Sequence, residues 1–494
     1  MKKVLIVGAG IAGLVCGVYA RMNGFDTQIY EMHTIPGGEC TGWDRGGYHF
    51  DGCIHWLMGT KKGTDLHEIW RATGALGEDT GIINHESFGT YEEDGRCVHL
   101  YTNADTLEKH LLEISPADSR EIRKLCKAIR ALGDFGAPLD KPMDMMTMGD
   151  GIGFAAKNMG KLGMVSRYGK MSMKQFCGLF KHPLLQNAFL AAIPGDYKAN
   201  ALVMTLASMH AGDSGFPAGG SRALAKRMEQ RFLALGGEVF YRHKVDKVIV
   251  ENGKAAGLRM TDGKEVRGDI VISCADGYAT LYRMLDNRHT PEIYQKLFED
   301  PHSHYLPTCA IVYMGIGCKL DAAYRSLCVK RDQAVNIAGL DNDLCMMLSY
   351  DYDETMAPQG KTVMASYYNA DFDYWNALHK DKEQYKKAKE RLEEDAVAML
   401  LKRYPQAEGK IEVTDVVTPM TYVRYCDAYR GAWMSWGDGG KDIPRYHAGE
   451  LPGLENFLMA GMWTLPPGGL PGAAMAGRFA AHRICIREGV AFQK

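Results

Sequence analysis

The first thirty residues contain the pattern that most constrains the fold of this chain. Residues 3–7 form an apolar run of strand length, residues 11–22 have helix length, and residues 26–30 return as a second strand. The turn between the first strand and the helix is Gly8-Ala9-Gly10-Ile11-Ala12-Gly13, which has the G-x-G-x-x-G spacing. This order predicts a strand–turn–helix–strand unit and an α/β fold around a parallel sheet.

An acidic residue follows the second strand at the position that a dinucleotide-binding unit requires. Glu31 ends that strand, and its carboxylate can accept hydrogen bonds from a ribose. Glycines let the backbone approach a pyrophosphate, whose charge is favoured at a helix N-terminus. We therefore predict that Gly8, Gly10, Ala12, Gly13 and Glu31 bind a dinucleotide. The alternative is a glycine-rich turn in an ordinary βαβ unit.

Length and composition limit the class of protein. The chain has 494 residues, and about 150 residues per domain gives two to four domains or one large composite fold. It is 46% hydrophobic and 24% charged, which is typical of a globular protein. Lys and Arg number 58 against 60 Asp and Glu, so no broad basic field exists to hold a phosphate backbone. We expect no nucleic-acid partner.

Cysteine usage and hydropathy suggest a location. Thirteen cysteines are scattered without a C-x-x-C pair or zinc-like spacing, so we expect no metal site and a reducing, cytoplasmic compartment. The apolar N-terminus superficially resembles a signal peptide, but its glycines and the strand that follows predict part of a folded domain. No apolar run of spanning length is present, and the sequence leaves association with a membrane surface open.

Two segments after Glu31 resemble a known family. Gly37-Gly38 forms a doublet, and residues 46–59 are GGYHFDGCIHWLMG. An acid followed by this doublet is similar to the flavoprotein superfamily of amine oxidases and phytoene desaturases. The longer stretch resembles its carotenoid isomerase and retinol saturase branch. The resemblance implies FAD as cofactor, with Gly37 and Gly38 near its pyrophosphate. Glu39 departs from the pattern, since the family commonly has Arg there.

Two later segments extend the resemblance. Residues 456–460 are expected to form a strand ending at Gly461, followed by a Gly/Pro loop and a helix from about residue 472 to 487. In the family this helix N-terminus faces the flavin, which implies contacts from Gly461, Gly469, Leu470 and Pro471. In the middle of the chain, the resemblance implies that Val245 covers the adenine with backbone contacts. The matching segments span residues 1–60, 215–280 and 410–485.

These observations predict the architecture. We expect an α/β protein with a Rossmann-like FAD-binding domain of the glutathione-reductase type and an inserted mixed α+β substrate domain. The discontinuous FAD-binding domain comprises residues 1–95, 215–285 and 445–494, and the substrate and lid domain comprises residues 96–214 and 286–444. A methionine-rich block at 143–173 is interpreted as a mobile lid over an apolar pocket, the alternative being a loosely packed helical cap.

Three residues are candidates for catalysis. His55 follows the segment expected to line the flavin. Two interpretations are open, a catalytic role or an ordinary, partly buried histidine. Tyr425 and Arg430 lie in an aromatic-rich stretch that resembles the family's loop over the flavin. By that resemblance, Tyr425 and Trp433 wall a substrate pocket, and Arg430 holds an anionic group.

The predicted function is that of an FAD-dependent oxidoreductase acting on carbon–carbon bonds of a small lipophilic substrate, isoprenoid or carotenoid-like. Desaturation, saturation and isomerisation remain open, as do the electron acceptor or donor and the oligomeric state. No second dinucleotide fingerprint is found in the sequence. One alternative is a flavin amine oxidase, and another is a non-catalytic lipid-binding protein on the same fold.

Overall fold

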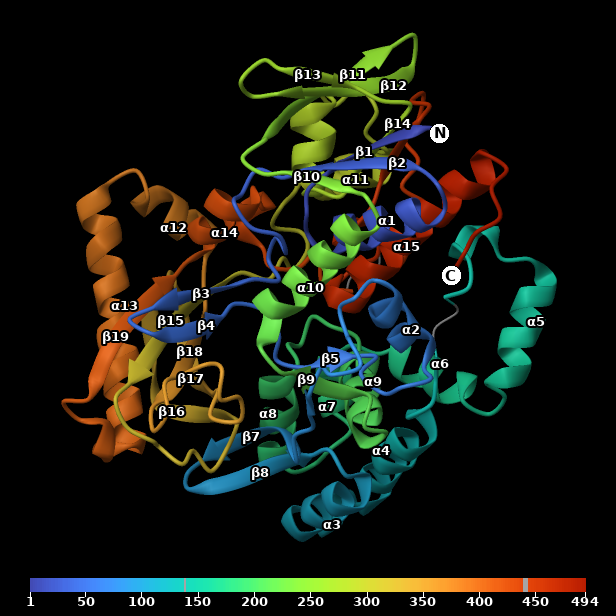
Figure 1. The fold of residues 1–494 in the computed structure, drawn as a ribbon. Helices are drawn as coiled ribbons and strands as arrows, with labels where there is room; N and C mark the ends of the chain where they lie inside the picture. The colour runs from blue at the N-terminus through green and yellow to red at the C-terminus, as the bar shows by residue number, and fades with distance from the viewer. Residues whose placement is uncertain (137–138, 439–442) are drawn as a thin grey trace.

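A computed structural model of the chain describes residues 1–136, 139–438 and 443–494 and is built around two large sheets (Figure 1). The first is a parallel sheet of five strands in the order β10-β2-β1-β14-β20. Its central strands are buried on both faces, as is typical of parallel sheets. The strands are β1 (Lys3–Val7), β2 (Asp26–Tyr30), β10 (Glu238–Phe240), β14 (Ile270–Ser273) and β20 (Phe457–Met459).

Three helices pack against this sheet and against one another. They are α1 (Ile11–Met22), α10 (Gly220–Ala234) and α15 (Gly469–Arg487). Almost every side chain of α1 is buried, since the helix lies between the sheet and its two neighbours. The strand–turn–helix–strand unit predicted at the N-terminus is therefore confirmed. Both ends and the middle of the chain contribute to this layer, as the colours in Figure 1 show.

A three-stranded antiparallel meander follows strand β10 in the sequence. It consists of β11 (Val245–Glu251), β12 (Lys254–Met260) and β13 (Glu265–Arg267). A two-residue hairpin turn joins β11 to β12, because Glu251 pairs with Lys254 and both Asn252 and Gly253 have positive φ. The third strand is only three residues long.

The second large sheet has seven strands in the order β19-β15-β18-β17-β16-β7-β8. The long hairpin β16–β17 lies between β18 and β7 in this sheet. A two-stranded ribbon lies nearby (Figure 1). The strands are β7 (Ser87–Glu93), β8 (Arg96–Tyr101), β15 (Cys309–Ile316), β16 (Ser326–Ile337), β17 (Leu340–Ser349), β18 (Thr362–Asn369), β19 (Ile411–Val417), and β3 (Gly42–Arg45) with β4 (Tyr48–Asp51) in the ribbon.

The domain boundary predicted at residue 95 falls in the Asp94-Gly95 turn between β7 and β8, and both strands belong to the seven-stranded sheet. The reason is that β7 pairs in parallel with β16 at Leu327, Cys328 and Val329, so the whole hairpin joins the second sheet. The chain therefore leaves the first layer before residue 87.

A helical layer packs beside β7 and β8. Pro116 begins a short turn that separates two helices within residues 104–132, because proline is favoured at the start of a new turn. Residues 193–199, which include Pro194 and Gly195, separate two further helices. The layer consists of α3 (Ala104–Ile114), α4 (Ser119–Leu132), α7 (Met173–Cys177), α8 (Pro183–Ala192) and α9 (Asn200–His210), which share one buried apolar cluster.

Shorter elements and the long charged helix α13 complete the fold. No helix in the described ranges has the length and apolar character needed to span a bilayer. These elements are α2 (Asp65–Ala72), α5 (Met148–Lys157), α6 (Leu162–Gly169), α11 (Glu292–Glu299), α12 (Phe372–Leu378), α13 (Lys382–Arg403), α14 (Pro419–Cys426), β5 (Leu57–Met58), β6 (Ile82–Ile83) and β9 (Ser214–Pro217).

Candidate functional site

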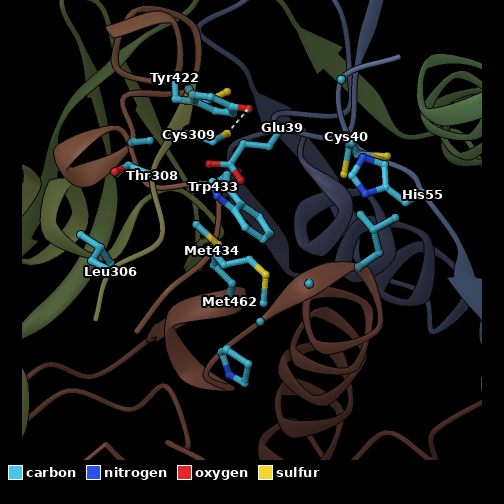
Figure 2. Close-up of a pocket in the computed structure, with 18 of the residues that line it drawn as sticks. Glu39, Cys40, His55, Leu306, Thr308, Cys309, Tyr422, Trp433, Met434 and Met462 are labelled. Carbon is cyan, nitrogen blue, oxygen red and sulfur yellow. Dashed lines mark hydrogen bonds between the residues drawn. The ribbon is translucent and has the colours of Figure 1, made fainter. Parts of the chain in front are cut away.

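A central cavity of about 1520 Å³ extends from the carboxyl ends of β1 and β14 to the seven-stranded sheet and the helices α8 and α9. One end is lined by the glycine-rich loops that the sequence singled out. The other end is lined mainly by aliphatic and aromatic side chains. Figure 2 shows side chains from these distant segments pointing into a common space. In open α/β sheets this edge is where cofactors bind.

The loop after β1 leaves a helix N-terminus open to the central cavity. Gly10 is the residue before α1, and no side chain caps the helix there. Gly8, Gly10 and Ala12 line the cavity, so the unpaired N–H groups of the first turn are available to a phosphate. Gly13 does not line it, because it faces the loop, and an added Cβ would overlap the carbonyl oxygen of Gly8. Gly13 therefore allows the tight turn rather than touching a ligand.

Glu31 lies at the end of β2 and faces this loop. Its carboxylate accepts hydrogen bonds from the N–H of Ala9 at 2.7 Å and from the N–H of His33 at 2.7 Å. Burial raises the pKa of Glu31, while these two bonds oppose that rise. A fixed acceptor at the end of the second strand matches the predicted ribose site.

The Gly37-Gly38 doublet closes over the first loop. The N–H of Gly37 donates to the carbonyl oxygen of Ala9 at 2.9 Å, and both glycines have positive φ. A Cβ added to Gly38 would lie 3.3 Å from the Cα of Gly10. Two backbone segments thus meet without side chains between them, which leaves room for a cofactor to lie against the main chain.

A second helix N-terminus, that of α15, faces the same cavity. Gly468 precedes α15, no side chain caps the helix, and its first turn contains no acid. Gly461, Gly469, Leu470 and Pro471 all line the cavity, and Gly461 has a φ of +119°. Two uncapped helix starts with positive partial charge fit a ligand that is anionic at two places, as FAD is at its pyrophosphate and reduced ring.

Val245 lies at the start of β11 and also lines the cavity, next to Lys244. Its side chain is 5% exposed and packs into the cluster beneath the parallel sheet. The position agrees with an adenine contact through the backbone, which stays a prediction.

His55 lies in the wall of the cavity beyond the doublet. Its Nε2 is 2.9 Å from the hydroxyl of Tyr367, and its carbonyl oxygen accepts a hydrogen bond from Arg325 at 2.7 Å. Burial, aided by the Arg325 charge, lowers the pKa of His55 to about 3. His55 is therefore a neutral group near neutral pH, so its side chain acts as a hydrogen-bond partner.

The structure does not bring Tyr425 and Arg430 together with His55. Tyr425 is 41% exposed and packs edge-on against His33 at 5.1 Å, near the ribose-binding Glu31. Arg430 is paired with Asp373 and stacks on Phe372, so its charge is already compensated. Both residues border the cavity, and their roles at a substrate wall and at an anionic group stay predictions.

Two carboxyl groups lie in the cavity near the doublet. Asp276 follows β14 and accepts hydrogen bonds from the N–H groups of Ala279 and Tyr429, at 2.9 Å and 3.0 Å. Glu39 points into the cavity beside Tyr422 and Trp433 (Figure 2). Burial raises the pKa of Glu39 to about 8, and the nearby Asp276 adds to the rise. Burial likewise raises the pKa of Asp276 to about 6.

The far end of the cavity is apolar. Helices α8 and α9 and strands β7 and β17 supply most of it, together with the loop after β4. Side chains of this kind favour a ligand that buries hydrocarbon surface. The apolar lining includes Trp56, Phe88, Leu190, Ile193, Met204 and Met346.

Among the described residues that line the central cavity, none belongs to the methionine-rich block at 143–173, and its role as a lid stays a prediction. The block is attached elsewhere, because Asp144 forms an ion pair with the buried Arg483 of α15 at 2.6 Å. Figure 1 shows α5 at the edge of the molecule, near the C-terminus of the chain. Met148 and Met159 are largely exposed there, at 84% and 82%.

Several lining residues were missed by the sequence reasoning. Asp276 had a usable signal, since an acid just after a parallel strand lies at the ligand-binding edge of the sheet. Tyr367, Tyr422 and Cys309 had none, because they meet only when the second sheet folds. The hydroxyl of Tyr422 lies 3.7 Å from the thiol of Cys309, the contact dashed in Figure 2.

Comparisons with known proteins agree with this geometry. The sequence model of the family described as flavin containing amine oxidoreductase matches residues 11–485. Prolycopene isomerase of Daucus carota is 23% identical, covering 98% of this chain and 80% of that protein. A 4,4'-diapophytoene desaturase of a Methylomonas species is 22% identical, covering 100% and 97%.

Among solved structures, cyclohexylamine oxidase from Brevibacterium oxydans superposes with a TM-score of 0.61 at 12% identity, covering 99% of both chains. That likeness supports the fold. The open helix starts and the glycine contacts fit FAD, and the family match extends over nearly the whole sequence. The chain therefore belongs to the flavin containing amine oxidoreductase family and is an FAD-dependent oxidoreductase.

Proposed function

We propose that this enzyme acts on carbon–carbon bonds of a lipophilic, isoprenoid substrate, by desaturation, saturation or isomerisation. The observation that carries the proposal is the continuity of the FAD end of the central cavity with a long apolar end. A polyene or its saturated counterpart offers hydrocarbon surface along its whole length, which matches such a lining. The names of the relatives, a prolycopene isomerase and a diapophytoene desaturase, support the same substrate class.

The chain's own residues perform three tasks in this reaction. The N-terminus of α1 and Glu31 hold the pyrophosphate and ribose ends of FAD, and the N-terminus of α15 stabilises negative charge at the other end. The apolar wall orients the hydrocarbon and excludes water from it. FAD, when bound, supplies a site that accepts or returns a hydride.

One feature favours the second candidate, a flavin amine oxidase. Glu39 and Asp276 place carboxyl groups in the cavity, and a carboxylate attracts an ammonium group. Against it, burial raises the pKa of Glu39 to about 8, which makes this group a weaker partner for a cation near neutral pH, and Asp276 is already bound to two backbone N–H groups. The substrate-binding end of the cavity is also apolar over several helices and strands.

Product analysis tests the proposal. The FAD-loaded protein is incubated with phytoene, prolycopene and lycopene, each with and without prior reduction, and in parallel with putrescine and cyclohexylamine. We expect a change in the number or geometry of double bonds in at least one polyene. Peroxide release from an amine, with every polyene unchanged, would select the amine oxidase instead.

A further inference from the structure

The Glu39 side chain has no partner within the described protein. No hydrogen bond or ion pair joins its carboxyl group to the rest of the described chain, whereas the backbone oxygen of Glu39 accepts the N–H of Thr41. The carboxyl group nevertheless points into the central cavity, where Figure 2 shows it between Tyr422 and Trp433. A carboxyl group removed from bulk water without a partner is costly unless it serves a ligand.

Among the described residues, the titratable groups that interact with Glu39 include no cation. Asp276 comes from the end of β14, Cys309 from β15, Tyr422 and Cys426 from α14, and Cys53 from the loop after β4. Burial favours the protonated form of Glu39 and the charge of Asp276 adds to this preference, so near neutral pH the group holds a proton that it can donate.

Several other titratable groups of the cavity are bound to protein partners. Asp276 accepts two backbone N–H groups, and His55 is bound to Tyr367. The Tyr422 hydroxyl contacts Cys309. Among the described residues near the Gly37-Gly38 doublet, Glu39 is a carboxyl group without such a partner and is therefore available to a ligand.

We propose that Glu39 is a catalytic residue that exchanges a proton with a carbon atom of the bound hydrocarbon. The proposal rests on the proposed function, because saturation and desaturation each move a proton onto or off carbon, and isomerisation can proceed by adding and then removing one.

The proton balance differs between the reactions. In saturation, the O–H bond of Glu39 breaks and the electron pair of the double bond forms a new C–H bond, and the hydride for the neighbouring carbon would come from reduced FAD. Glu39 is left as a carboxylate and regains its proton from solvent. In desaturation, the ionised form of Glu39 accepts a proton from carbon, and oxidised FAD would take up the hydride.

Isomerisation needs no net oxidation. Glu39 donates its proton to one end of the conjugated system, the carbon chain rotates about the bond that has lost double-bond character, and the carboxylate then removes a proton from the same carbon. The double bond returns in the other geometry, and no electrons leave the substrate. In all three reactions Glu39 acts as a general acid or base, a role worth about 10²–10⁴-fold in rate.

The test uses the full chain loaded with FAD, as wild type, Glu39→Gln, Glu39→Asp and a control, Glu68→Gln. Glu68 lies on the exposed face of α2, paired with Arg71, away from the cavity. Conversion of phytoene, prolycopene and lycopene is measured in D₂O. We expect Glu39→Gln to lose about 10²–10⁴-fold in rate, Glu39→Asp to keep part of it, and FAD affinity to stay unchanged. Glu68→Gln should behave as wild type.

A second readout is independent of turnover. Infrared spectra of the FAD-loaded protein, recorded against pH, should show the C=O stretch of a protonated carboxylic acid that disappears as pH rises through about 8. This band should be missing from Glu39→Gln and present in Glu68→Gln. A wild-type spectrum without the band would overturn the assignment of Glu39 as the acid.

The outcomes separate the two proposals. If wild type converts a polyene and Glu39→Gln converts it equally fast, the assignment of Glu39 is wrong and the proposed function stands. If Glu39→Gln loses activity because FAD no longer binds, Glu39 is a cofactor-binding residue and the assignment is also wrong. If wild type converts no polyene, the proposed function and the role of Glu39 fail together.

Discussion

Gly477 of α15 packs directly onto Ala12 of α1, so that a Cβ added to Gly477 would overlap the carbonyl oxygen of Ala12. This contact joins the last helix of the chain to the first. It also sets the separation of the two helix N-termini that open into the central cavity. The FAD site therefore depends on the packing of the last helix of the chain against the first.

We predict that Gly477→Ala destabilises the protein by about 1–3 kcal/mol, because an added methyl group must displace backbone. Denaturant unfolding of the FAD-free protein measures the change. The matched control is Gly163→Ala in α6, where a Cβ meets nothing within 4 Å. There the free energy of unfolding should stay the same or rise by up to about 1 kcal/mol. Equal effects of the two substitutions would contradict the packing argument.

Glu31→Gln should weaken FAD binding. The amide has only one acceptor oxygen, so Ala9 or His33 loses the bond its N–H now donates, and the charge facing the ribose disappears. A hydrogen bond to a charged group is worth about 1.5–3 kcal/mol, which corresponds to roughly 10- to 100-fold in affinity. Fluorescence titration of the apoprotein with FAD measures it. Glu238→Gln on the exposed end of β10 is the control and should leave the affinity unchanged.

His55 makes stability depend on pH. Its pKa in the folded protein is about 3, below the ordinary value near 6.5, so between these values the unfolded chain binds a proton that the folded chain does not. Stability is therefore lost as pH falls from about 6.5 towards 3, by up to about 1.4 kcal/mol per pH unit. Urea unfolding at several pH values should show a shallower slope for His55→Gln. An unchanged slope would mean that His55 is protonated in the fold.

Asp144→Ala should loosen the methionine-rich block without affecting the cavity. Asp144 is bound to the buried Arg483, which also keeps Glu450 as a partner. We expect faster proteolysis within residues 145–170 and an unchanged affinity for FAD, because the block does not line the cavity. A large loss of polyene binding would instead support the lid that the sequence suggested.

Local patterns predicted the first layer of the fold well. The glycine spacing and Glu31 lie within one short βαβ unit, whose geometry is set by neighbours in sequence. The second sheet was harder to predict. Residues 332–334, in the middle of strand β16, are all exposed. The strand therefore lacks a regular alternation of buried apolar and exposed polar side chains.

The candidate site shows the same division. The loops at Gly8, Gly37 and Gly469 were identified because their glycines are close together in sequence. The positions of Tyr425 and Arg430 could not be identified in this way, because they depend on contacts with His33 and Asp373, which lie in remote segments of the sequence. Glu39 stood out in the sequence as a departure from a family pattern, but only the fold shows that its carboxyl group faces the cavity without a partner.

The most direct measurement of the central claim is the visible spectrum of the bound flavin under anaerobic conditions. FAD-loaded protein is mixed with phytoene, and the protein with chemically reduced FAD is mixed with lycopene. Putrescine serves as the amine control. We expect phytoene to bleach the oxidised flavin, lycopene to reoxidise the reduced flavin, or prolycopene to be converted with the flavin spectrum unchanged at the end. We expect no response of the flavin to putrescine. A flavin that is bleached by putrescine, with no reaction of any of the three polyenes, would contradict it.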